Sequence, residues 1–220
     1  MASPPNGIVL CALCAAFAAC APAEDGAAHA ARAKYDPATG RLEQIEFDTT
    51  RNGRYDAVGV MHGTRVDRIE VDEDEDGKVD RWEYYDEARR LVQVGYSRRN
   101  NGLVDATAFF DRDGAIERIE ISTRADGQFN RVEYYRADAL ARVEEDTNGD
   151  RRPDKWESYT PVPGAASGAS RIGSAAFDDA FRGTPNRRFV YGAGGGVLRV
   201  EVDPDGDGQF VDAAVIAGPP

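Results

Sequence analysis

Residues 65–85 read RVDRIEVDEDEDGKVDRWEYY, and this stretch decides the fold. Apolar and polar residues alternate on both sides of an acidic loop that contains Gly77. A period of two, with Ile, Val, Trp and Tyr at the apolar positions, is typical of β-strands. The stretch therefore predicts two short strands joined by an acidic loop.

The same unit recurs along the chain, and it aligns on a repeated glycine. The aligned residues are Gly53, Gly77, Gly102 and Gly127, which are spaced 24, 25 and 25 residues apart. A fifth copy is centred on residues 146–151, where Arg151 replaces the glycine, and a sixth runs from 191 to 216. Regular self-similarity of this kind predicts an array of identical structural units.

The turns between units predict how the strands are arranged. Short turn sequences, such as residues 36–40 and 111–114, join each aromatic strand to the next branched one. Strands connected so closely run antiparallel. The chain is therefore expected to be all-β, an antiparallel meander of about ten to twelve short strands with Asp-rich loops at one end. A single layer would leave aromatic residues in water, so we expect the sheet to be curled, closed or packed on itself.

Composition limits the core and the partners. The chain has 220 residues and a net charge of −12, which disfavours binding to nucleic acid through a basic face. Leu, Ile, Val and Phe make up 42 of the 220 residues, roughly 19%, just below the ~20% typical of disordered charged chains. Something besides apolar burial is therefore expected to stabilise the fold.

The N-terminal region predicts export. Residues 8–19 are apolar and uncharged, but shorter than the ~20 residues that span a bilayer, so residues 1–19 are interpreted as a signal peptide. Phe17-Ala18-Ala19-Cys20 resembles the lipobox of bacterial lipoproteins. This resemblance implies cleavage before Cys20, acylation of Cys20, for example by palmitate, and a membrane-anchored place in the bacterial envelope, at the outer membrane or cell surface. Ordinary cleavage near residues 19–23, which would give a secreted protein, is the alternative.

The remaining boundaries follow from composition and from the repeat. Residues 20–34 are expected to form a flexible tether, and residues 35–160 to hold repeats one to five. Residues 161–188, rich in Gly, Ala and Ser, break the period and are expected to be an irregular insertion before the final repeat at 189–220. Residues 35–42 resemble the Tyr-Asp repeats of bacterial shell-forming β proteins, which supports the fold and implies no activity.

The acidic loops predict metal binding. Residues 72–83 match the twelve-residue loop of EF-hands, in which hard oxygen atoms at alternate positions converge on Ca²⁺. The predicted ligands there are Asp72, Asp74, Asp76, Lys78, Asp80 and Glu83. The Asp-rich spacing resembles EF-hand loops, thrombospondin type 3 repeats and FG-GAP repeats, and the resemblance implies calcium. A solvated acidic turn is the alternative, because Asp, Asn and Gly are good turn formers.

Other copies of the loop offer further ligands, and two copies do not. The additional predicted ligands are Asp48, Asn52, Asp56, Asp146, Asn148, Asp150, Asp154, Glu157, Asp203, Asp205, Asp207 and Asp212. In the third and fourth copies, Arg99 and Arg124 stand where an inward-pointing oxygen is required. We expect these arginines to replace the cation by pairing with Asp105 or Asp126.

Catalytic motifs are missing from the sequence. It has no Gly-x-Ser-x-Gly, phosphate loop or zinc-binding His pair. We therefore expect a non-catalytic, calcium-stabilised module that binds a partner or supports the cell envelope. Trp82, Trp156, Tyr85 and Tyr135 either pack in the core or form an aromatic ladder for a protein or glycan. A helical EF-hand calcium-binding protein and a secreted hydrolase are the alternative functions.

Overall fold

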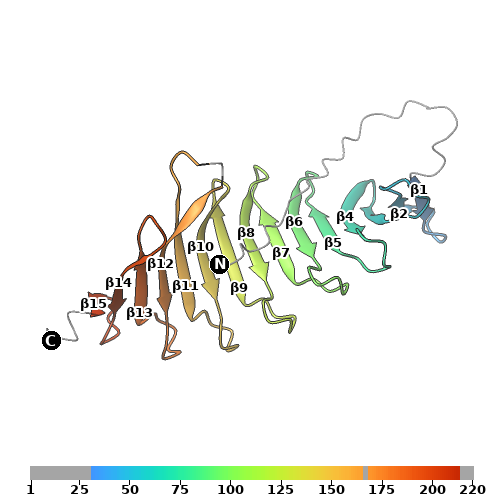
Figure 1. Ribbon diagram of the computed structural model, residues 1–220. Helices are drawn as coiled ribbons and strands as arrows, with labels where there is room; N and C mark the ends of the chain where they lie inside the picture. The colour runs from blue at the N-terminus through green and yellow to red at the C-terminus, as the bar shows by residue number, and fades with distance from the viewer. Residues whose placement is uncertain (1–30, 166–167, 214–220) are drawn as a thin grey trace.

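A computed structural model describes residues 31–165 and 168–213. They form one sheet of fifteen strands that follow each other in chain order (Figure 1). The predicted signal peptide, Cys20 and residues 20–30 of the predicted tether lie outside the described residues. The strands are β1 (Ala31–Tyr35), β2 (Leu42–Phe47), β3 (Ala57–His62), β4 (Arg65–Val71), β5 (Arg81–Tyr85), β6 (Leu91–Tyr96), β7 (Ala106–Phe110), β8 (Ile116–Ile121), β9 (Arg131–Arg136), β10 (Ala139–Glu145), β11 (Lys155–Pro161), β12 (Ser170–Phe177), β13 (Arg187–Tyr191), β14 (Val197–Val202) and β15 (Val211–Asp212).

The predicted all-β antiparallel meander is confirmed, with fifteen strands instead of about ten to twelve. Part of the difference lies in residues 31–34, which pair with β2 where a tether was expected. Residues 161–188 contain β12 and the start of β13, although an irregular insertion was expected. Small residues such as Gly173 and Ala175 hide the strand pattern of β12. The extra residues lengthen the turn between β11 and β12.

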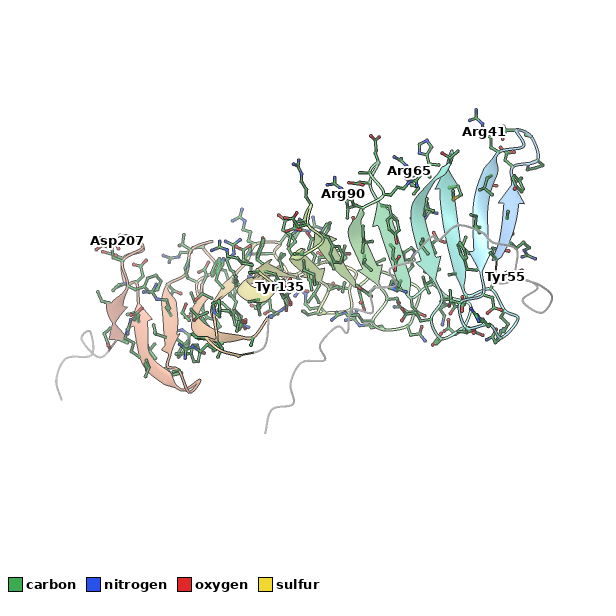
Figure 2. All side chains as sticks on the ribbon, turned by 90° about the horizontal axis from the view of Figure 1, so that it is seen from above. Arg41, Tyr55, Arg65, Arg90, Tyr135 and Asp207 are labelled. Atoms are coloured by element: carbon green, nitrogen blue, oxygen red, sulfur yellow. The ribbon has the colours of Figure 1, made fainter. Side chains whose placement is uncertain are left out.

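The sheet is a single open layer. Within the described residues, each strand contacts its neighbours in the chain, and the one further contact joins β10 to β12. The order runs from β1 at one edge to β15 at the other, so the sheet does not close. Strand direction changes along the sheet, so β1 and β2 lie nearly end-on in Figure 1 and side-on in Figure 2. This rotation is the twist expected of neighbouring strands.

One face of the sheet carries most of the buried apolar residues, and we call it the apolar face. Strand register places one residue of each strand in a continuous row on this face. Between β2 and β9 the row contains Ile45, Gly59, Ile69, Glu83, Val94, Ala108, Ile119 and Glu133. The most buried cluster lies on β6, β7 and β8 and comprises Val94, Ala106, Ala108, Phe110, Ile119 and Ile121.

The opposite face is covered by long side chains, and we call it the arginine–aromatic face. Its central row is Arg68, Tyr84, Gln93, Phe109, Arg118, Tyr134 and Arg142. The guanidinium carbon of Arg118 lies 3.7 Å from the Phe109 ring centre, and that of Arg142 lies 4.2 Å from the Tyr134 ring centre. Such stacking shields aromatic rings from water without a second layer of strands.

Candidate metal centre

Seven loops lie at one end of the strands, at the lower side of Figure 1. We call this row the loop rim. It consists of residues 48–56, 72–80, 97–105, 122–130, 146–154, 178–186 and 203–210. The first residue of each later loop donates its backbone N–H to the ninth residue of the loop before it. For example, Ser97 N donates to Asp80 O at 2.7 Å and Asp72 N to Asp56 O at 2.8 Å. The rim is therefore one continuous hydrogen-bonded row.

The first side chain of most loops accepts hydrogen bonds from the loop's own backbone. Asp72 accepts from Asp76 N at 3.1 Å and from Gly77 N at 2.8 Å. Gly77 has a φ of 89°, a left-handed conformation that suits glycine. Arg151, at the same position of loop 146–154, adopts a φ of 70°, so that loop keeps the geometry without a glycine. Part of the Asp pattern therefore serves loop folding.

In the six loops of nine residues, the ninth side chain also accepts a hydrogen bond from the backbone of its loop. Asp80 accepts from Glu73 N at 2.8 Å, and Asn130 accepts from Thr123 N at 2.8 Å. An amide oxygen can replace a carboxylate here, so the position requires a hydrogen-bond acceptor and no charge.

Two groups of acids come together closely enough to hold a cation. Carboxylate oxygens of Asp72, Asp74 and Asp80 lie within 4.8 Å of one another, and so do those of Asp203, Asp205 and Asp207. Among the described residues, these are the groups of three or more potential ligands. Hard carboxylate oxygens are the ligands that Ca²⁺ prefers.

The carboxylates of the first group repel one another. Burial raises the pKa of Asp80, and repulsion from Asp74 and Asp72 adds to this rise, although hydrogen bonds from the loop backbone oppose it. A cavity of about 310 Å³ opens beside the group, lined by loops 72–80 and 97–105. Both loops of clustered acids are flanked by strands, whereas an EF-hand loop is flanked by helices.

Three other predicted residues of this region have different partners. Asp76 pairs with Lys78 at 2.6 Å, and the hydrogen bond from Lys78 lowers the Asp76 pKa. Glu83 lies on β5 at the apolar face, where Arg81 and the Tyr85 hydroxyl donate to it. The structure therefore does not bring Asp76 or Glu83 into the three-carboxylate group.

The acids of loops 48–56 and 146–154 accept hydrogen bonds from the backbone of their own loop. Asp48 and Asp56 accept backbone N–H groups of their own loop, as do Asp146 and Asp154. The remaining predicted residues are also placed: Asn52 accepts from Arg54 N, Asn148 donates to Asp150, Glu157 lies on β11, and Asp212 lies on β15 opposite Glu201. Within the described part of the chain, these loops form no group of three acids.

The predicted arginine pairs are confirmed. Arg99 lies 3.2 Å from Asp105, and Arg124 lies 3.4 Å from Asp126. The structure adds contacts that the sequence analysis missed. Arg98 also pairs with Asp105 at 3.0 Å, and Arg124 donates to the backbone oxygen of Asp146 at 3.0 Å. In the sequence, the Arg98–Asp105 pair is indicated by two consecutive arginines in a loop that ends with Asp105.

A group of ion pairs on the apolar face was not predicted from the sequence. It joins Arg131, Glu133, Glu145, Lys155 and Glu157 across β9, β10 and β11, with contacts of 2.8 to 3.9 Å. Its sequence signal is a cation, a Glu and a Tyr at alternate positions, present on β5, β9 and β11.

The aromatic residues that were considered for a partner do not form one ladder. Tyr85 and Tyr135 donate to Glu83 and Glu133 on the apolar face. Trp82 lies in a row with Glu70 and Gly95 on the arginine–aromatic face. Trp156, opposite Glu144, is on that same face.

No helix among the described residues is long and apolar enough to cross a membrane. Comparisons with known protein families and with curated proteins give no match. The function is therefore inferred from the residues and geometry of this chain.

Proposed function

We propose that the protein is an exported calcium-binding β-repeat protein that acts as a non-catalytic binding or structural module of the cell envelope. The observation that carries this proposal is the convergence of Asp72, Asp74 and Asp80 within 4.8 Å. No Lys or Arg of the described residues forms an ion pair with these three carboxylates. A divalent cation there would neutralise the repulsion between them.

The second group of clustered carboxylates lies at the other end of the rim. Loop 203–210 contains three acids and no Lys or Arg, and its acids also converge within 4.8 Å. Bound calcium would supply positive charge and close each loop around itself. Extracellular modules of this kind bind calcium with a Kd of ~10⁻⁴ to 10⁻³ M, which suits the calcium outside cells.

The cellular part of the proposal rests on the N-terminal sequence. The apolar segment at 8–19 supports export, and the lipobox resemblance supports a lipid anchor at Cys20. The two broad faces of the sheet offer area for a protein or glycan partner, and Trp82, Tyr84, Tyr134 and Trp156 lie half-buried on the arginine–aromatic face.

The test is a calcium titration of the chelator-treated protein, followed by its melting temperature. Calcium at about 100 times its Kd should stabilise the fold by about 2.7 kcal/mol per independent site and raise the melting temperature accordingly. The double variant Asp72→Asn with Asp74→Asn should lose the part of the calcium-induced rise in melting temperature that comes from loop 72–80. Asp126→Asn should keep the full rise. Equal melting in calcium and in chelator would disprove calcium binding.

A further inference from the structure

Adjacent loops of the rim are not held together in the same way. All are joined by the backbone hydrogen bond described above. At the N-terminal flank the exposed Arg54 also pairs with the Glu75 carboxylate of the next loop at 3.4 Å. Among the described residues, only the central loops have guanidinium groups that donate to the backbone of the next loop. Arg98 and Arg99 each donate to the backbone oxygen of Ser122 at 3.2 Å. These two bonds join loop 97–105 to loop 122–130.

The next junction is built similarly. Arg124 donates to the backbone oxygen of Asp146 at 3.0 Å, and its other terminal nitrogen lies 3.6 Å from the Asp146 carboxylate. The Asn130 amide donates to the same backbone oxygen at 3.2 Å. Loop 122–130 is therefore joined to loop 146–154 by side chains from both of its ends.

The charge of the loops follows this division. Loop 97–105 contains two arginines and one acid, and loop 122–130 contains one of each. Loop 72–80, in contrast, contains six acids and one lysine. Arg99 and Arg124 occupy the third position of their loops, where loop 72–80 has Asp74 and loop 203–210 has Asp205. A fixed cation thus stands in the centre where the flanking loops present carboxylates.

The strands above the loops show the same contrast. The most buried apolar cluster lies on β6, β7 and β8, which adjoin the arginine-containing loops. At the C-terminal flank, Val197 and Leu198 of β14 are 52% and 69% exposed. At the N-terminal flank, β4 and β5, which adjoin loop 72–80, have one buried residue each. Apolar burial therefore supports the flanks less than it supports the centre.

We propose that Arg99 and Arg124 are built-in cations that keep strands β6–β10 ordered without metal, while calcium at loops 72–80 and 203–210 controls the order of the flanks. The second half of this inference rests on the proposed calcium binding. The first half does not, because it depends on guanidinium contacts alone.

Hydrogen exchange of the full-length protein, followed by mass spectrometry, tests both halves. In chelator, peptides from β4, β5 and β14 should exchange about tenfold faster than in millimolar calcium, a loss of local protection of about 1.4 kcal/mol. Peptides from β6–β10 should exchange equally in both conditions. Protection that changes uniformly along the sheet would overturn the division between centre and flanks.

A double variant, Arg99→Gln with Arg124→Gln, tests the arginines separately. In chelator, the amides of β6–β10 in this variant should exchange about tenfold faster than in the parent. Arg112→Gln, in the exposed turn between β7 and β8 at the opposite end of the strands, should exchange like the parent. Unchanged central protection in the double variant would overturn the role of the arginines.

Calorimetric calcium titration of the parent separates the two proposals. Absence of calcium binding would disprove both the proposed calcium function and the calcium control of the flanks. The role of Arg99 and Arg124 in the centre would then be decided by the double variant. Stoichiometric binding with unchanged exchange in the flanks would overturn the flank half alone.

Discussion

Ser122 shows how one position of the repeat can depart from the pattern. It is fully buried at the first position of its loop, and its hydroxyl has no hydrogen-bond partner among the described residues. Ser97, at the same position of the preceding loop, accepts from Asn101 N and Gly102 N, both at 3.1 Å. The Ser122 hydroxyl therefore does not accept the backbone hydrogen bonds that the Asp72 carboxylate accepts in its own loop.

Ser122→Asp should stabilise the protein. A carboxylate extends further than a hydroxyl and should accept the loop N–H groups, as Asp72 does, next to the guanidinium groups of Arg98 and Arg99. The expected gain is about 1 kcal/mol in the free energy of unfolding, measured with urea. Ser97→Asp is the matched control, and it should gain less because its hydroxyl is already bonded. A destabilised Ser122→Asp protein would show that the loop has no room for the larger side chain.

At the scale of the element, three strands place charged groups in the middle of the apolar face. On β11, burial raises the pKa of Glu157, but hydrogen bonds from Lys155 and Tyr159 outweigh this effect and the net pKa is lowered. On β9 and β11, burial and the neighbouring glutamates raise the pKa of Tyr135 and Tyr159 well above the ordinary value. The cluster is therefore built for ionised glutamates and neutral tyrosines.

This cluster predicts a loss of stability in acid. Because the pKa of Glu157 is lower in the folded protein than its ordinary value of 4.5, ionised Glu157 stabilises the fold above about pH 4.5. That contribution is lost as the pH falls through the lower folded pKa. Urea unfolding between pH 7 and pH 3 should therefore show a difference between the parent and Glu157→Gln that shrinks in acid. A difference between the parent and Glu157→Gln that stays constant over this pH range would contradict the assignment.

On the scale of the whole molecule, stability is distributed along one dimension. Because strands contact mainly their chain neighbours, each hairpin depends on the two beside it and little on distant ones. The single layer has no common core to which all strands contribute. Local opening without global unfolding is the expected behaviour of such a sheet.

Ile119→Ala should reveal this behaviour. Ile119 is 5% exposed in the central cluster, and its truncation should cost about 2 to 4 kcal/mol. Hydrogen exchange should lose protection around β7, β8 and β9 and stay unchanged in β2 and β13. Phe189→Ala, on β13, should lose protection around β12, β13 and β14 and leave β7, β8 and β9 unchanged. Uniform loss of protection in both variants would indicate a cooperative, two-state molecule.

Features set by neighbouring residues were predictable from the sequence. Alternation within residues 65–71 and 81–85 predicts strands, and the spacing from Gly53 to Gly127 predicts a serial hairpin array with its acidic loops at one edge. The Arg99–Asp105 pair was also predictable, because both residues belong to one loop. These features depend on backbone periodicity and turn chemistry, which act over a few residues.

Tertiary structure alone decided the rest. The sheet stays open because stacked arginine and aromatic side chains cover one face and the other buries its ion pairs among apolar neighbours, and this cover depends on cross-strand register. Whether Asp, at a given loop position, meets other carboxylates or its own backbone depends on the path of the loop. For that reason Asp72, Asp74 and Asp80 converge, whereas Glu83, in the same spacing pattern, is carried onto β5 and bonded to Arg81 and Tyr85.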